Sequence, residues 1–353
     1  MKNLMKVKSL LTDVDGILLT SVSNRFYCTE GDVSEGVALV SKSSSFYYTD
    51  SRYIEAAEKC LQGFTVKMVD RQNTYAKRLQ EDLSALGIQK LGYEEDSFTV
   101  REFKTYRDAL KVEFIPMQNA LDKLRWVKEP WELERMRKAQ AITDLAFSQV
   151  LERIRPGMTE KQLQAELIYC LYKNGADGLS FDPIVVSGPN TSLPHGEAGD
   201  RVIREGDFVT MDFGVKLQGY CSDMTRTVAV GYATEEMEKV YHTVLQAQKA
   251  GIAATKAGVK GKEVDAAARQ VITEAGYGEY FGHGYGHGIG LQVHESPSCN
   301  TGGETVMEAG MVSSAEPGIY LPGKFGVRIE DVVVFTADGC ENLTHSPKNL
   351  III

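Results

Sequence analysis

Five acidic or imidazole residues stand where the sequence otherwise predicts buried strands or glycine-rich turns. They are Asp212, Asp223, His287, Glu316 and Glu330. An ionised carboxylate is very costly to bury without a partner, so each acid needs an arginine, several hydrogen bonds or a metal ion. Taken one at a time, each acid is better explained as a salt-bridged structural residue.

Taken together, the five residues favour a metal site. Four carboxylates at one place carry four negative charges. One divalent ion would leave two of these uncompensated, whereas two divalent ions would balance them all. Carboxylate oxygens with one imidazole suit manganese, cobalt, iron or zinc, and suit copper(I) poorly. The residue types therefore predict a site for two divalent cations, provided that the fold brings the five residues together.

A predicted β-hairpin joins two of the acids. Segments 207–215 and 220–230 are rich in β-branched and aromatic residues, and the short segment 216–219 connects them. Asp212 lies on one arm and Asp223 on the other. Their separation allows two antiparallel strands to bring the carboxylates together.

A faint internal repeat surrounds this hairpin. Gly157 and Gly175 bracket one predicted helix, and Gly258 and Gly276 bracket another; both pairs are 18 residues apart, and the pairs are offset by 101. A longer predicted helix precedes each bracketed helix, and β-rich sequence follows it. We expect two similar αα-plus-β halves related by a pseudo-twofold axis, with an active site at their junction.

The sequence before about residue 125 predicts a separate α/β domain. Apolar runs suited to strands and helical patterns alternate there: strands at 16–20, 37–40 and 46–49, and helices at 51–62, 72–87 and 117–125. The character changes at Pro130, which opens a helix with acids in its first turn. We expect an α/β amino-terminal domain over residues 1–125 and an α+β catalytic domain over residues 126–353.

Composition and charge argue against several classes of protein. The formal net charge of −9 disfavours nucleic acid and anionic membranes as partners, and no apolar run reaches the length of a membrane span. The apolar stretch after the basic start is interrupted by Asp13 and Asp15, which makes it a poor secretion signal. The six scattered cysteines form no Cys-x-x-Cys pair. We therefore expect a cytoplasmic protein with reduced thiols.

Five short segments resemble, in order, the creatinase/aminopeptidase P/prolidase/methionine aminopeptidase family. The segments are Asp212-Phe213-Gly214, Cys221-Ser222-Asp223-Met224-Thr225-Arg226-Thr227, Gly286-His287-Gly288-Ile289-Gly290, Glu316-Pro317-Gly318-Ile319-Tyr320 and Arg328-Ile329-Glu330-Asp331. The likeness covers residues 130–353 strongly and implies the pita-bread fold for that domain. The first 125 residues resemble the smaller amino-terminal domain of the proline-specific members. No metal position departs from the family pattern, whereas metal-free relatives lack these ligands.

The resemblance assigns a role to each metal-site residue. It implies that Asp212 binds one ion, that Asp223 and Glu330 bridge both ions, and that His287 and Glu316 bind the second. Manganese or cobalt is expected, with zinc or iron as alternatives. A hydroxide bridging the two ions would be the nucleophile. Glu316 would also accept its proton and later protonate the leaving nitrogen.

The same resemblance places five further residues around the substrate. His195 and His294 would line the cleft and act on the substrate or the tetrahedral intermediate. His283, Tyr320 and Arg328 would bind the substrate near the leaving group. None of these five would bind metal.

The implied function is hydrolysis of the Xaa-Pro peptide bond. The enzyme would be an Xaa-Pro dipeptidase (prolidase) or an Xaa-Pro aminopeptidase, and the compact length favours the dipeptidase. The alternatives are a methionine aminopeptidase-like enzyme and a non-catalytic peptide-binding module on the same fold. The expected partners are proline-containing dipeptides or peptides and a second copy of the chain in a homodimer, with no nucleic acid and no membrane.

Overall fold

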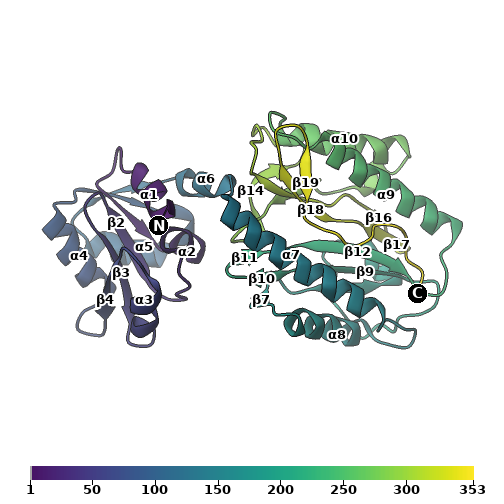
Figure 1. Cartoon of the computed structure of the whole chain (residues 1–353), viewed down its shortest axis with the longest axis horizontal. Coiled ribbons are helices and arrows are strands. Elements are labelled where there is room, and N and C mark those ends of the chain that lie inside the picture. The colour runs from purple at the N-terminus through teal and green to yellow at the C-terminus, as the bar shows by residue number, and fades with distance from the viewer. Residues whose placement is uncertain (1) are drawn as a thin grey trace. The chain divides into compact units, whose positions relative to one another are not determined.

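The apolar runs of the first 125 residues form the middle of a six-stranded sheet, in a computed structural model that describes residues 2–353 (Figure 1). The strand order is β4-β3-β2-β1-β5-β6, with β1, β5 and β6 parallel and β2 antiparallel to both of its neighbours. The elements of this part are α1 (Lys2–Ser9), β1 (Gly16–Leu19), α2 (Val22–Thr29), β2 (Val37–Ser41), β3 (Ser45–Asp50), α3 (Ile54–Cys60), β4 (Thr65–Val69), α4 (Tyr75–Leu86), β5 (Lys90–Tyr93), η1 (Glu95–Ser97), α5 (Val100–Ala109), β6 (Glu113–Pro116) and α6 (Ala120–Trp126). The three strands and three helices predicted here are confirmed, and α1, α2 and α5 were not predicted.

The chain divides into two compact units between Arg125 and Trp126. The second unit contains two pairs of long helices and four sheets, in the strand orders β12-β9-β8, β14-β13-β15-β18-β19, β11-β10-β7 and β16-β17. Its elements are α7 (Pro130–Leu151), α8 (Glu160–Lys173), β7 (Gly178–Leu179), β8 (Ile184–Ser187), η2 (Gly188–Ser192), β9 (Phe208–Phe213), β10 (Val215–Leu217), β11 (Tyr220–Cys221), β12 (Met224–Ala229), α9 (Glu235–Ala254), α10 (Gly261–Glu274), η3 (Gly278–Tyr280), β13 (Gly286–Gly288), β14 (Glu295–Cys299), β15 (Val312–Ala315), β16 (Gly318–Leu321), β17 (Phe325–Arg328), β18 (Asp331–Phe335) and β19 (Cys340–Asn342).

The four glycines that suggested an internal repeat share one backbone conformation. Gly157, Gly175, Gly258 and Gly276 have φ angles of 94°, 97°, 89° and 87°, in the left-handed region that disfavours other residues. A side chain at any of the four would meet no atom within 4 Å, so backbone conformation and not packing space is what favours glycine there. The glycines flank α8 and α10 at matching positions, which confirms the predicted repeat.

Backbone pairing extends the repeat from the helices to the strands. Thr159 forms an isolated antiparallel bridge with Val202, and Lys260 forms the same bridge with Val306. The offset between the halves is therefore 101 at the helix starts and 104 at their bridge partners, Val202 and Val306. The helices α7 and α8 pack on β9 and β12, while α9 and α10 pack on β15 to β18, so each half has its own hydrophobic core. In Figure 1 strands lie between α8 and α10.

The predicted hairpin is present but is divided between two sheets. Its base is β9 paired with β12, in which Thr225 faces Asp212, and its tip is β10 paired with β11 in a different sheet. The break falls at Gly214, where a Cβ atom would lie 2.0 Å from the carbonyl oxygen of Ser222. The two arms pair as predicted, and at this close backbone approach they pass from one sheet to the other, which the sequence did not indicate.

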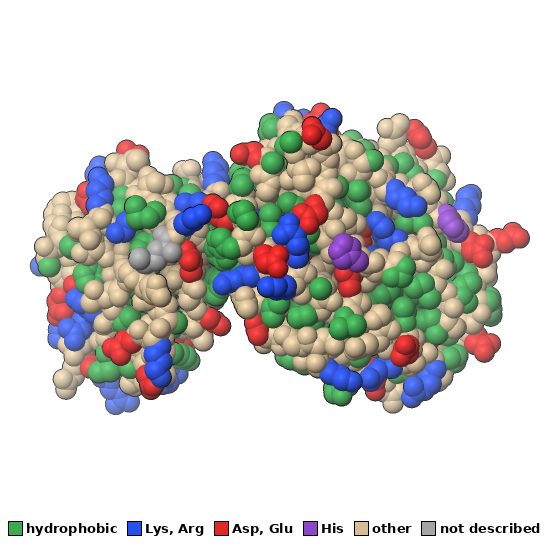
Figure 2. Space-filling model, viewed as in Figure 1, with side chains coloured by type: hydrophobic (Ala, Val, Ile, Leu, Met, Phe, Trp, Pro, Cys, Tyr) green, Lys and Arg blue, Asp and Glu red, His purple; other side chains and the backbone are tan. Residues whose placement is uncertain are grey.

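Charged side chains of both signs are interspersed over the face that Figure 2 shows. Among the residues that the structure describes, no helix combines the length and the apolar character needed to span a bilayer.

Gly251 on α9 provides a test of how this helix packs against residues 283–287, the segment that contains His283 and His287. A Cβ atom there would lie 2.2 Å from the ring of Tyr285, which is 1% exposed and follows Gly284. We expect Gly251→Ala to lower the free energy of unfolding by about 1–3 kcal/mol through overpacking, although alanine is favoured over glycine in helices by about 1 kcal/mol. Chemical denaturation measures the change. Gly178→Ala is the control, because a Cβ atom there meets nothing within 4 Å; equal effects of the two substitutions would contradict this account.

Candidate metal centre

Nearly all the predicted site residues line one cavity of about 310 Å³ in the second unit. They are His195, Asp212, Asp223, His283, His287, His294, Glu316, Arg328 and Glu330. Tyr320 does not line the cavity, but it contacts two residues that do. The lining also includes Phe181, Ile184 and Val293, which no sequence pattern indicated and which give one part of the cavity an apolar wall.

The ends of four strands and the middle of a fifth deliver the candidate ligands. Asp212 lies near the end of β9 and Glu316 directly follows β15, while Asp223 directly precedes β12 and Glu330 directly precedes β18. His287 is the central residue of β13. Asp212 and Glu316 are 104 residues apart, which is the offset between the strands of the two halves. The repeat therefore contributes an equivalent carboxylate from each half.

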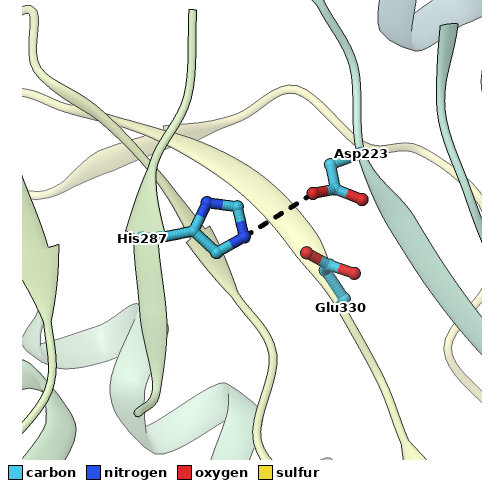
Figure 3. A group of neighbouring side chains, drawn as sticks. All are labelled: Asp223, His287 and Glu330. Atoms are coloured by element: carbon cyan, nitrogen blue, oxygen red, sulfur yellow. Dashed lines mark ion pairs between the residues drawn. The ribbon is translucent and has the colours of Figure 1, made fainter. Parts of the chain in front are cut away.

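Three of the ligand candidates point toward one another across a short gap. Asp223, His287 and Glu330 each offer an atom within 4.8 Å of the others (Figure 3). The His287 Nε2 atom lies 3.7 Å from Asp223 Oδ2 and 3.2 Å from Glu316 Oε1. Asp212 is held by the Arg328 guanidinium, with 2.7 Å between Nη2 and Oδ2.

The buried carboxylates repel one another. Burial, followed by the charges of Glu330 and Asp212, raises the pKa of Asp223 well above its ordinary value. Burial, followed by the charges of Glu316 and Asp212, does the same to the pKa of Glu330. Burial also raises the pKa of Glu316, but the hydrogen bond and positive charge of a protonated His287, together with the charges of His283 and Arg328, outweigh burial and hold that pKa at about 2. Burial likewise raises the pKa of Asp212 against the opposing charge of Arg328, so three of the four carboxylates resist ionisation unless a cation joins them.

Two buried carboxylate oxygens and one histidine nitrogen indicate whether a metal would fit these five residues. Asp212 Oδ1 and Asp223 Oδ1 are buried and find no hydrogen-bond partner within residues 2–353. His287 Nδ1 lies 3.0 Å from the carbonyl oxygen of Gly288. A carbonyl can only accept, so Nδ1 carries a proton, and in its neutral form the ring presents the lone pair of Nε2 to the carboxylates. Free oxygens and an oriented imidazole nitrogen are the donors that a divalent transition metal takes, so the residues fit such an ion.

Two hydroxyl groups that the sequence did not single out orient the ligands. Thr225 Oγ1 donates to Glu330 Oε2 (2.7 Å) and accepts from Arg328 Nε (3.0 Å). Ser314 Oγ donates to Glu316 Oε1 (2.9 Å) and accepts from the His287 amide (3.0 Å). Thr225 could have been found, because residues two apart on a strand share a face and Asp223 precedes it by two.

A chain of hydrogen bonds links the three predicted substrate-binding residues. His283 Nδ1 donates to the Gly284 carbonyl (2.9 Å), which leaves Nε2 to accept from the Tyr320 hydroxyl (2.8 Å). The same hydroxyl accepts from Arg328 Nη1 (3.0 Å). Burial is the main factor that lowers the pKa of His283. A neutral imidazole is the form that this chain of donors requires.

The two remaining histidines lie on the wall of the cavity and not among the carboxylates. His294 is exposed, and its ring centroid lies 4.3 Å from that of His287. Partial burial and then the charge of His287 lower the pKa of His294. His195 is also exposed, and within the described structure its ring makes no hydrogen bond. Both positions suit contact with a bound molecule.

Substitution of one ligand candidate tests the proposed metal centre. Asp223→Asn removes a negative charge and a buried oxygen donor from the group. Removing a residue that only hydrogen-bonds to a metal ligand lowers the metal affinity by about 10–100-fold. Loss of a ligand itself is therefore expected to weaken binding of one metal by at least about 100-fold. Metal content per chain after dialysis, measured beside a Mn²⁺ titration, checks this.

Asp144→Asn is the control for that substitution. Asp144 is half-buried and binds the amides of His345 and Ser346, and it does not line the cavity. If Asp223→Asn keeps the metal content of the Asp144→Asn protein, Asp223 is a structural residue.

Comparisons with known proteins agree with this geometry. The model of metallopeptidase family M24 matches residues 134–337, and that of the creatinase/prolidase N-terminal domain matches residues 3–127. The structure of an Xaa-Pro dipeptidase from Bacillus anthracis is 43% identical, with a TM-score of 0.97 over 100% of this chain and 99% of that one. An X-Pro aminopeptidase from Thermotoga maritima is 36% identical, with a TM-score of 0.93 over 99% of each chain.

Among curated relatives, an Xaa-Pro dipeptidase of Pyrococcus horikoshii is 35% identical over 98% of each chain. The expected fold class and family are confirmed: the chain belongs to metallopeptidase family M24 and carries the creatinase/prolidase type of amino-terminal domain.

Proposed function

We propose that this chain hydrolyses the peptide bond in front of proline, with two divalent metal ions held by Asp212, Asp223, His287, Glu316 and Glu330. The observation that carries the proposal is the group of four carboxylates and one oriented imidazole in a single cavity. Relatives that share this fold over nearly the whole chain are named Xaa-Pro dipeptidase or X-Pro aminopeptidase. The creatinase/prolidase amino-terminal domain favours this activity over that of a methionine aminopeptidase.

Charge balance supports two ions over one. Arg328 is 4% exposed and pairs with Asp212, so it supplies one positive charge to the group. With a neutral His287, the four carboxylates still leave three negative charges in a buried site. One divalent ion would leave at least one of these uncompensated, and two would leave the site slightly positive and attractive to a carbonyl oxygen. Manganese or cobalt is proposed, with zinc or iron as alternatives.

When bound, the ions would polarise the scissile carbonyl and supply a water nucleophile active near neutral pH. The chain's own residues do the remaining work. The Glu316 carboxylate is proposed to accept a proton and deliver it to the proline nitrogen, because a secondary amine must be protonated to leave. Ser314 fixes this carboxylate by donating to its Oε1.

The cavity wall would hold the substrate. His195 and His294 are exposed, so a bound peptide would bury them and bring their donors to the reacting carbonyl. His283, Tyr320 and Arg328 form one hydrogen-bonded unit beside Glu316 and would bind near the leaving proline. Dipeptides are the proposed preference over longer peptides. A homodimer is proposed for the active protein on the family resemblance alone, and a cytoplasmic location on the scattered cysteines.

Metal-dependent cleavage of Xaa-Pro dipeptides is the direct test. Protein stripped with a chelator is expected to lose activity, and manganese or cobalt to restore it, because the nucleophile depends on the metal. Steady-state rates on an Xaa-Pro dipeptide are expected to exceed those on the matching Xaa-Pro-Yaa tripeptide. The Xaa-Ala dipeptide is the control for proline selectivity. Full activity in a demonstrably metal-free sample would contradict the metal-dependent mechanism.

Three histidine substitutions separate metal ligands from residues of the cavity wall. His287→Ala is expected to lower metal content, because it removes a donor of the group. His195→Ala and His294→Ala are expected to keep both ions and to slow turnover by about 10²–10³-fold, the usual loss for one contact that stabilises a charged intermediate. Metal analysis beside kinetics on the three variants decides the assignment. Retention of both ions by His287→Ala, or an emptied metal site in either of the others, would reverse it.

A further inference from the structure

The segment that carries His195 is irregular and is positioned through its backbone. Residues 187–199, here called the His195 segment, run from the end of β8 through η2 to the loop before β9. Pro194 and His195 line the cavity. Because the ring of His195 makes no hydrogen bond in the described structure, the path of the segment alone sets where this imidazole stands.

A single buried carboxylate fastens both ends of this segment. Glu160 is 0% exposed. Its Oε1 accepts from the Ser187 amide (2.7 Å), the Ser187 hydroxyl (2.8 Å) and Asn190 Nδ2 (3.0 Å). Its Oε2 accepts from the Gly199 amide (2.9 Å). The carboxylate therefore joins the residue that opens the segment to the residue that closes it.

Neither of the two usual roles of an acid at a helix start, capping the helix and pairing with a basic side chain, explains Glu160. It begins α8, but Thr159 already caps that helix by accepting from the Gln162 amide, and the Gln162 side chain completes the capping box. No basic side chain in the described structure lies within salt-bridge distance of Glu160. A buried carboxylate without a cation is costly, and here only the donors of the His195 segment and the positive end of the helix dipole offset that cost.

The middle of the segment is attached to the reaction site by other contacts. The Pro194 carbonyl accepts from Arg328 Nη1 (3.1 Å), and Thr191 Oγ1 accepts from the Gly326 amide (2.8 Å). These bonds place the segment against β17, whose last residue pairs with Asp212. With its middle resting on β17 and its ends tied to Glu160, the segment holds His195 at the mouth of the cavity.

We propose that Glu160 is a positioning residue for His195: its carboxylate fixes the His195 segment so that the imidazole meets the substrate. The proposal rests on the proposed function, in which His195 acts on the bound peptide. Glu160 itself does not line the cavity and would touch neither substrate nor metal.

Glu160→Gln tests the proposal at nearly constant volume. The amide group must direct an N–H donor at the Ser187 or the Gly199 amide, so one end of the segment is released. In the metal-loaded full chain we expect unchanged metal content and a fall in kcat/KM of about 10–100-fold, the scale for a misplaced catalytic group. In a His195→Ala background we expect Glu160→Gln to change kcat/KM by less than about 2-fold, because the two substitutions remove the same contribution.

Glu94→Gln is a matched control in the amino-terminal unit. Glu94 is also buried, at 7% exposed, and it accepts from the amides and hydroxyls of Thr20 and Ser21 and from the side-chain amide of Asn24. Its substitution is expected to cost thermal stability and to leave kcat/KM unchanged. An equal loss of kcat/KM in both variants would make Glu160 a general stability residue and overturn the proposal.

Amide hydrogen exchange separates failure of this proposal from failure of the proposed function. In Glu160→Gln, faster exchange confined to residues 188–199 is expected whether or not the chain cleaves Xaa-Pro bonds. Unchanged exchange there, lost metal, or independent effects of Glu160→Gln and His195→Ala would each overturn the positioning role. Should Glu160→Gln fail to fold, Asn190→Ala removes one donor from the segment side, and the same exchange and kinetic changes are expected at smaller size.

Discussion

The repulsion among four carboxylates in one buried cavity is the constraint on which the rest of the catalytic unit depends. Burial and mutual charge raise the pKa of Asp223 and Glu330, and the Thr225 hydroxyl and Arg328 oppose this rise only in part, at Glu330. Such a group is stable only when cations enter it and when its members cannot move apart. The strands satisfy the second condition, because every ligand lies within or directly beside a hydrogen-bonded strand.

The internal repeat explains how these carboxylates meet and where the site departs from symmetry. Asp212 and Glu316 occupy equivalent strand positions, offset by 104. In the neighbouring strands Ser187 pairs with Val209, and Gly288 pairs with Ser313. Val209 and Ser313 are again 104 residues apart, but their partners are 101 apart, so β8 and β13 are offset by 101. His287 is then the counterpart of Val186, which is 1% exposed. Two similar halves supply matching acids, and the single imidazole comes from one half only. The repeat thus supplies matching acids to the cavity but an unmatched imidazole, so the two sides of the proposed metal centre differ.

Prediction from sequence succeeded for features that leave a local or periodic trace. The glycine pairs revealed the repeat because a left-handed turn leaves few other choices of residue. The acids of the site stood out because they interrupt apolar strands. The break in the hairpin at Gly214 depends on a backbone approach that no local pattern records. Helix α2 was missed because six of its eight residues, most of them polar, are buried by distant parts of the chain.

Glu160 shows most clearly where sequence reasoning stops. In sequence it is an ordinary acid in the first turn of a helix, a position that the helix dipole favours. Its function comes from Ser187, Asn190 and Gly199, which lie 27 to 39 residues away. Only the docking of α8 against the His195 segment makes the residue unusual. The same holds for Thr225, whose hydroxyl meets Glu330 across a separation of 105 residues.

The two exposed histidines share a mode of support that distinguishes them from the metal ligands. His195 lies on a segment tied by buried Glu160, and His294 directly precedes Glu295, whose side chain is 2% exposed and pairs with Lys128 at 3.4 Å. Glu295 also accepts from the Gln292 amide, which holds the turn before His294. The ligands need rigidity against their own repulsion and lie on strands. In the proposed function the two histidines meet a substrate, and they lie on loops whose far side is held by buried carboxylates.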